Sequence, residues 1–199
     1  MSNVVLIYKK FERFWHWMQA FLIISMVVTG LEIHGVYSLF GFEKAVTLHN
    51  IAAACWGFLI ITMFTWILST GEWKQYMPTT DGLFATAKFY MFGIFKGEKH
   101  PHKKNELSKL NPLQRLTYLG LMVGLIPAQI ITGLLYVSYH QWGVVGLAGT
   151  IDLVAYAHTF IAYSIISFVI VHVYMTTMGH TLTAHIKSMI TGYEDLDEH

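Results

Sequence analysis

Four histidines lie within or at the ends of long apolar stretches of this 199-residue chain: His16, His49, His158 and His172. A neutral imidazole is a common metal ligand, and it exchanges protons near neutral pH. A polar ring at membrane depth is costly unless it faces the interior of a helix bundle and finds a partner there. The type and position of these residues therefore predict metal ligation or proton transfer.

Two of the histidines share one predicted helix. The stretch Leu153–Gly179 contains no charged side chain, and it is long enough to cross a hydrocarbon layer of ~30 Å. His158 and His172 are fourteen positions apart, so at ~100° and ~1.5 Å per residue they project from nearly the same face, about 21 Å apart. One helix would thus offer two nitrogen ligands at two membrane depths.

The composition is that of an integral membrane protein. Apolar residues make up 54% of the chain and charged residues 13%, against ~25% charged in soluble proteins. The single cysteine, Cys55, provides no disulfide framework and no cysteine-ligated iron–sulfur site. A net charge of +1 does not indicate a nucleic-acid partner. The first apolar run is longer than the core of a signal peptide, so we expect a retained membrane span.

The elements that must position the histidines are predicted to be four membrane-spanning helices. They make an all-α integral membrane fold, a four-helix bundle in one domain over residues 1–199. Asp81–Phe95 has an aromatic-rich face and is expected to be an interfacial amphipathic helix, and Pro127 is expected to kink the third span. The expected spans are Phe14–Ile33, Thr47–Ser69, Pro112–Ser138 and Leu153–Gly179.

Basic residues predict the orientation of these spans. Of the 13 lysines and arginines, all except Lys44 fall in the N-terminal arm, in residues 71–115 or in the C-terminal tail. By the positive-inside rule, both termini and residues 71–115 are cytoplasmic, whereas the loops 34–46 and 139–152 face outward. We expect a multi-pass membrane protein with its N- and C-termini in the cytoplasm.

This orientation groups the four histidines by depth. His49 and His158 lie near the outer face, whereas His16 and His172 lie near the cytoplasmic face. Ligation of a haem iron by two imidazoles needs two facing helices that present histidines at equal depth, and a four-helix bundle supplies that geometry. The sequence therefore predicts two haems b, with His49/His158 and His16/His172 as axial pairs.

Intramembrane histidines can also form a zinc site or a di-metal site, or can carry protons in a transporter. A zinc site gathers three or four protein ligands at one depth, and no H-E-x-x-H motif occurs. A di-metal oxidase needs a denser cluster of histidines and carboxylates. A proton-coupled transporter is the alternative function, although such proteins usually have broken helices at the midplane, whereas these histidines lie toward the two faces.

Several strings resemble the bacterial cytochrome b561 family: RFWHWMQAFLIISMVVTG, LHNIAAACWGF, KLNPLQRLTYLG and AHTFIAYSIISFVIVHVY. More narrowly, the chain is similar to the cytochrome b subunits of formate dehydrogenases, nickel–iron hydrogenases and thiosulfate-reductase-type enzymes. The resemblance implies a di-haem anchor in the bacterial cytoplasmic (inner) membrane that passes electrons between a periplasmic redox subunit and the quinone pool. The partner would be an iron–sulfur protein or multihaem cytochrome c, the quinone menaquinone or ubiquinone. A catalytic metal centre is expected on another subunit of the larger complex.

The resemblance also implies a quinone site at Asn111 and Gln114, near the cytoplasmic haem. Amide groups can bond to a quinone carbonyl. Asn111 followed by Pro112 is equally a good helix start, with Asn as the cap and Pro at the first helical position. His180 and His185 follow the fourth span and are candidates for proton transfer. The outward loops, which include Tyr139 and Trp142, are expected to dock the periplasmic partner.

Overall fold

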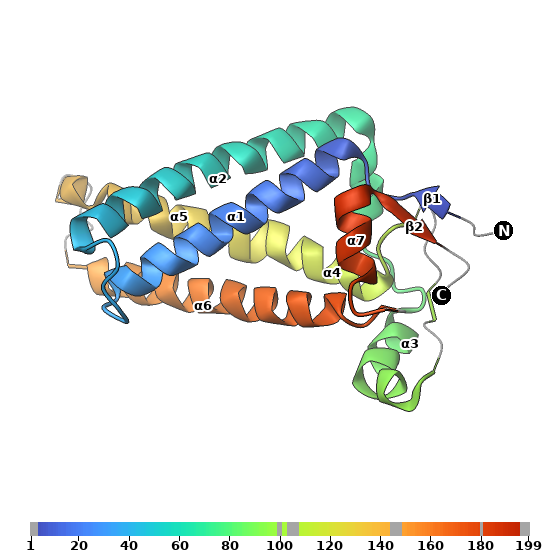
Figure 1. The fold of residues 1–199 in the computed structure, drawn as a ribbon. Coiled ribbons are helices and arrows are strands. Elements are labelled where there is room, and N and C mark those ends of the chain that lie inside the picture. The colour runs from blue at the N-terminus through green and yellow to red at the C-terminus, as the bar shows by residue number, and fades with distance from the viewer. Residues whose placement is uncertain (1–3, 99–100, 103–107, 144–148, 180, 196–199) are drawn as a thin grey trace. The chain divides into compact units, whose positions relative to one another are not determined.

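The computed structural model describes residues 4–98, 101–102, 108–143, 149–179 and 181–195, and it is mostly helical (Figure 1). Within these residues, four helices are long and apolar enough to cross a membrane: Lys10–Ile33, Phe42–Thr70, Pro112–Val137 and Ile151–Thr176. The four predicted spans are confirmed: the first still ends at Ile33 and the third still begins at Pro112, and the other ends move by one to five residues. The chain forms two compact units, Met1–Lys74 with Thr183–Glu198, and Gln75–Leu182.

The first unit is a helical hairpin with a small sheet. Helices α1 (Lys10–Ile33) and α2 (Phe42–Thr70) pack along each other, as Figure 1 shows in blue and teal. The 3-10 segment η1 (Glu72–Tyr76) follows α2. Strand β1 (Val4–Leu6) pairs antiparallel with β2 (Tyr193–Asp195), which follows helix α7 (Ala184–Thr191). The all-α prediction missed this sheet because strands of three residues carry no periodic pattern.

Side chains of α1 hold the C-terminal segment in this unit. Arg13 Nη1 donates to the Ile190 carbonyl at 2.5 Å, and Trp17 Nε1 donates to the Met189 carbonyl at 3.2 Å. Both acceptors lie in α7, near its C-terminal end. The start of the first span and the segment that follows the fourth span are therefore tied together by direct hydrogen bonds.

The two ends of the hairpin in the first unit are joined by an ion pair. Lys9 Nζ donates to Glu72 Oε1 at 2.5 Å, and the same ammonium lies 5.8 Å from the ring centroid of Trp66. The hydrogen bond to Glu72 raises the pKa of Lys9 above its ordinary value. Since the Lys9 side chain is 53% exposed, the pair contributes little free energy but defines which helix ends meet.

The loop between α1 and α2 is organised by a buried carboxylate. Glu32, which is 5% exposed, accepts backbone N–H groups from Leu39, Phe40 and Gly41 at 2.8, 2.7 and 2.7 Å. Three donors to one oxygen offset the desolvation of the charge. The loop is therefore held in a single conformation from within the first unit.

The second unit contains the third and fourth spans and a short helical arm. The third span is continuous but has three parts, α4 (Pro112–Gly120), a π-helical turn η4 (Leu121–Leu125) and α5 (Ile126–Val137). The short 3-10 helix η5 (Tyr139–Gln141) follows, and α6 (Ile151–Thr176) packs along α5. The π turn ends two residues before Pro127, whose nitrogen cannot donate a helical hydrogen bond.

The predicted helix at Asp81–Phe95 is present as three short segments. These are α3 (Leu83–Lys88), the π turn η2 (Phe89–Gly93) and the 3-10 turn η3 (Ile94–Lys96). Thr86 and Phe89 are buried on one side of this arm, and α3 packs against α4. The exposed apolar side chains are Phe84, Met91, Phe92 and Phe95. The arm thus exposes a row of apolar side chains, and its position at the membrane interface stays a prediction.

Candidate histidine sites

In the first unit, His49 on α2 packs against the backbone of α1. Its Nδ1 lies 3.0 Å from Oγ1 of Thr29. A Cβ at the neighbouring Gly30 would lie 3.5 Å from the His49 Cε1 atom, an ordinary contact distance. The imidazole alone therefore does not require glycine here. Gly30 instead keeps the helix surface beside the ring flat, as a planar macrocycle would need.

The surroundings of Thr29 indicate the tautomer of His49. The single hydroxyl proton of Thr29 is donated to the Ser25 carbonyl at 2.8 Å, with the Met26 carbonyl 3.3 Å away. With its proton on a helix carbonyl, the Thr29 hydroxyl presents its oxygen to Nδ1 of His49, which favours the ring proton on Nδ1. In this tautomer the Nε2 atom of His49 has the lone pair, the arrangement needed to bind a metal.

The second unit repeats this arrangement around His158 on α6. Thr132 Oγ1 lies 2.9 Å from Nδ1 of His158, and it donates to the Ala128 carbonyl at 2.8 Å. A Cβ at Gly133 would lie 3.4 Å from the His158 Cε1 atom. In both units a Thr–Gly pair on one helix contacts a histidine on the next helix with the same atoms.

Gln129 gives a second indication of the His158 tautomer. Its amide Nε2 lies 3.0 Å from His158 Nε2, and in this orientation the amide favours a lone pair on that ring nitrogen. The buried Oε1 of Gln129 has no hydrogen-bond partner among the described residues. Because the amide approaches the nitrogen that would bind a metal, Gln129 must turn away when one is bound.

His16 lies in the second turn of α1 and His172 in the last two turns of α6, each far along its helix from the Thr–Gly or histidine position described above. The His16 ring, near the start of α1, makes an edge contact with Trp17, with centroids 5.2 Å apart. The His172 ring, near the end of α6, stacks on Phe168 at 5.8 Å. Both histidines are half-buried.

Each unit presents its histidines at two levels. In the first unit, His16 precedes Thr29, the contact of His49, by thirteen positions, which is about 20 Å along α1. In the second unit, His158 and His172 are about 21 Å apart along α6. The spacing between the two levels is therefore nearly equal in the two units.

These donors fit a metal held in a macrocycle. Among the described residues, no group of three or more His, Cys, Asp or Glu side chains could hold a metal ion. A haem supplies four equatorial nitrogens itself and needs only axial ligands. Single histidines with the lone pair on Nε2, each beside a glycine, meet that need.

Comparison with known proteins decides the family. Residues 7–192 match the model of the family described as prokaryotic cytochrome b561. The chain belongs to the prokaryotic cytochrome b561 family. It is also 32% identical over 199 residues to the "Putative cytochrome YdhU" of Escherichia coli (strain K12), covering 95% of this chain and 74% of that protein. No solved structure matches it.

Membership in the family confirms the resemblance predicted from the sequence. This cytochrome b561-type protein is a membrane cytochrome, and its family binds haem b. Its four apolar helices agree with that family. The number of haems and the residues that hold them remain predictions.

Asn111 and Gln114, the predicted quinone residues, cap the start of α4. Asn111 Oδ1 accepts from the Gln114 N–H at 2.8 Å, and Gln114 Oε1 accepts from the Asn111 N–H at 3.0 Å. Asn111 Nδ2 also donates to the Tyr90 hydroxyl at 3.1 Å. The capping interpretation is thus confirmed, and the quinone role stays a prediction.

In the second unit, contacting aromatic rings lead from Tyr118, in the last turn of α4, to His172. Tyr118 contacts Phe168 edge-on, with centroids 6.4 Å apart, and Phe168 stacks on His172. The Asn111 cap lies at the start of the same helix α4. The candidate quinone residues and His172 therefore belong to one continuous part of the second unit.

Two further expectations concern the ends of the helices. His185 Nδ1 lies 3.9 Å from Glu194 Oε1, which is buried, whereas His180 lies outside the described residues. Trp142 is buried and donates from Nε1 to the Leu135 carbonyl at 3.1 Å. It therefore packs within its own unit, beside Tyr139, and is not available as an exposed contact.

Residues that the sequence analysis missed include Thr29, Thr132, Gln129 and Tyr90. A detectable signal existed for the threonines, because MVVTGLEI near the end of the first span is echoed by QIITGLLY near the end of the third. Gln129 and Tyr90 carry no comparable pattern. Their roles depend on contacts between residues distant in sequence.

Proposed function

We propose that this cytochrome is the membrane-anchoring di-haem subunit of a respiratory oxidoreductase complex. It would carry electrons across the membrane between a periplasmic redox partner and the quinone pool. The observation that carries the proposal is the presence, in each unit, of histidines at two levels about 20 Å apart. The Thr29 and Thr132 hydroxyls lie against Nδ1 of His49 and His158, which favours a lone pair on Nε2 of both rings.

The proposed axial pairs are His49 with His158 and His16 with His172. The support is that each unit contributes one histidine per level, with nearly equal spacing between the levels. When bound, each haem supplies a one-electron carrier. The protein contributes the axial nitrogens, the flat surfaces at Gly30 and Gly133, and a low-dielectric setting that excludes water.

We place the quinone near the cytoplasmic level, beside Asn111 and Gln114. Tyr90 adds a hydroxyl to this group through its hydrogen bond to Asn111. Burial raises the pKa of Tyr90, so its hydroxyl stays protonated near neutral pH and can act as a donor. Reduction of a quinone takes up protons, and the His185–Glu194 pair at the C-terminal segment provides titratable groups.

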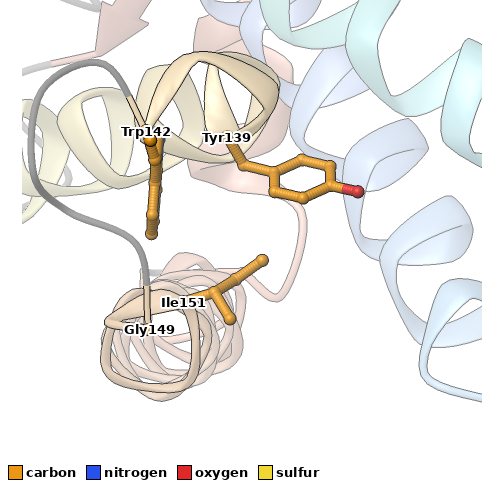
Figure 2. Close-up of a pocket in the computed structure, with 5 residues that line it drawn as sticks. Tyr139, Trp142, Gly149 and Ile151 are labelled. Carbon is orange, nitrogen blue, oxygen red and sulfur yellow. The ribbon is translucent and has the colours of Figure 1, made fainter.

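The periplasmic partner is proposed to dock on the loops 34–46 and 139–152. In the first unit, the loop ordered by Glu32 exposes Val36, Leu39 and Phe42. In the second unit, Tyr139, Trp142, Gly149 and Ile151 line a small, mostly apolar pocket (Figure 2). The backbone hydrogen bonds of Leu39, Phe40 and Gly41 to Glu32 hold the first loop in place, and a fixed loop with exposed apolar side chains suits a packed contact better than a mobile one.

An absorption spectrum of the purified protein tests the proposal. We expect a Soret band, a narrow α band on reduction, and a pyridine haemochrome assay that gives two haems b per chain. The proton-coupled transporter hypothesis predicts none of these. A preparation that is folded and fully expressed in haem-replete cells but lacks haem would overturn the proposed function.

A further inference from the structure

We propose that Thr29 and Thr132 are matched positioning residues that set the tautomer and the donor strength of His49 and His158. The inference rests on the proposed function, since it assigns both threonines a role toward the haem proposed to be bound by His49 and His158. Neither the family match nor the prediction from the sequence gives these two threonines a role. Its basis is the same local geometry, found independently in two units.

The two hairpins begin in the same way. Helix α1 starts with one half of a capping box, in which Lys9 N–H donates to the side chain of Glu12 three residues later, at 2.6 Å. Helix α4 starts with the full box, in which Asn111 N–H makes the corresponding bond to Gln114 Oε1 at 3.0 Å. An arginine follows directly in each case, at 13 and 115. The helix starts therefore give a common register for comparing the first and third spans.

Counted from the helix starts, the Thr–Gly pair of the third span comes one residue later than the pair of the first span. Thr29 follows Glu12 by seventeen positions, whereas Thr132 follows Gln114 by eighteen. The π turn at Leu121–Leu125 lies between them in the third span. A π turn holds one residue more than an α turn. It thereby restores the helical phase, so that Thr132 faces His158 as Thr29 faces His49.

The hydroxyl in each pair acts on the ring nitrogen remote from the metal. It donates its proton to a helix carbonyl, at 2.8 Å for both threonines, and its oxygen lies 3.0 or 2.9 Å from the histidine Nδ1. An Nδ1–H that donates to this oxygen holds the ring orientation. It also makes Nε2 a stronger donor, which favours the ferric form of a bound iron.

Other threonines show that the carbonyl bond alone does not explain this arrangement. Thr65 Oγ1 donates to the Ile61 carbonyl at 2.9 Å, and Thr117 Oγ1 donates to the Leu113 carbonyl at 2.8 Å. Both make the same bond to the preceding turn, yet neither hydroxyl has a histidine partner among the described residues. Thr65 and Thr117 are therefore matched controls for the loss of a helix-bonded hydroxyl.

The test is a spectroelectrochemical titration of the purified holoprotein carrying Thr29→Val or Thr132→Val. Haem content is measured on the same samples. Each variant should keep two haems, and one midpoint potential should move to a more positive value. We expect a shift of up to about tenfold in the redox equilibrium, which is ~59 mV for a one-electron couple. Thr29→Ser and Thr132→Ser keep the oxygen and should restore the wild-type potential.

Both valine variants should shift the same haem, because His49 and His158 are proposed to share it. Unchanged potentials in Thr29→Val and Thr132→Val, or equal shifts in Thr65→Val and Thr117→Val, would overturn the inference and leave the proposed function intact. If the valine variants lose a haem, the inference is judged on Thr29→Ser and Thr132→Ser, which keep the hydroxyl oxygen. Retention of haem at the wild-type potential supports the inference, and loss of haem overturns it. A wild-type protein without haem would overturn the proposed function instead.

Discussion

The side-chain amide of Asn111 donates from Nδ2 to the hydroxyl of Tyr90 at 3.1 Å. This bond joins the amphipathic arm at residues 83–96 to the first turn of α4. It also brings a phenol, an amide and the neighbouring Gln114 amide together at one helix start. The group that the family resemblance links to quinone is therefore larger than the sequence alone indicates.

Replacement of Asn111 by Leu should slow electron exchange between haem and quinone while both haems stay bound. The change removes the Nδ2 donor to Tyr90 and also a helix cap worth about 1 kcal/mol. Asn111→Asp is the companion variant, since it keeps a capping oxygen but replaces the Nδ2 donor with a charged carboxylate oxygen. Stopped-flow oxidation of the reduced protein by a soluble quinone measures the rate. We expect both variants to be slower than wild type.

Unchanged quinone turnover in both Asn111 variants would move the quinone site elsewhere. So would a quinone analogue that perturbs only the spectrum of the His49/His158 haem.

The loop between α1 and α2 should lose its order when Glu32 is replaced by Ala. Three backbone N–H groups lose the single acceptor that they share, so residues 39–41 lose the bonds that hold them to the end of α1. We expect faster limited proteolysis within residues 34–46, with haem content retained. Glu32→Gln keeps a carbonyl oxygen and should be intermediate. Equal cleavage of wild type and Glu32→Ala would show that the loop is held by other contacts.

Partner docking is predicted on the outward loops. A photo-crosslinking residue in place of Leu39, which is 65% exposed, should capture a redox subunit when the complex is assembled in native membranes. The matched probe replaces Phe84 in the amphipathic arm, where the side chain is 81% exposed, and should capture lipid. Capture of the redox partner only at position 84 would reverse the assignment of the two faces.

Both termini are predicted to be cytoplasmic. The unit that contains the β1–β2 pair joins the two terminal segments directly, so one assay of either terminus reports on both. A C-terminal fusion to green fluorescent protein should fluoresce, and a fusion to alkaline phosphatase should be inactive. The opposite result would invert the depth assigned to all four histidines.

Sequence reasoning recovered the features that depend on local pattern. Four apolar runs predicted four spans, and the Asn111–Pro112 pair predicted a helix start, because length and capping chemistry are read directly from neighbouring residues. The same reasoning missed the β1–β2 pair, since its strands lie at opposite ends of the chain. It also missed the link from Thr132 to His158, because a threonine in an apolar helix usually bonds only to its own backbone.

The π turn at Leu121–Leu125 was likewise beyond a local reading. Pro127 indicated an irregularity in the third span, but a proline does not specify where an extra residue is accommodated. The effect of the π turn follows from comparing the first and third spans. The extra residue brings Thr132 into the same contact with His158 that Thr29 makes with His49.

The central claim is that two haems b are held by His49/His158 and His16/His172, and a redox titration of His49→Ala tests it most directly. Haem content and midpoint potentials are measured on the purified variant, with His185→Ala as a control from outside the spans. The account predicts that His49→Ala loses or alters one haem and leaves the second at its wild-type potential, whereas His185→Ala keeps both. Two haems per chain with an unchanged titration in His49→Ala would contradict it.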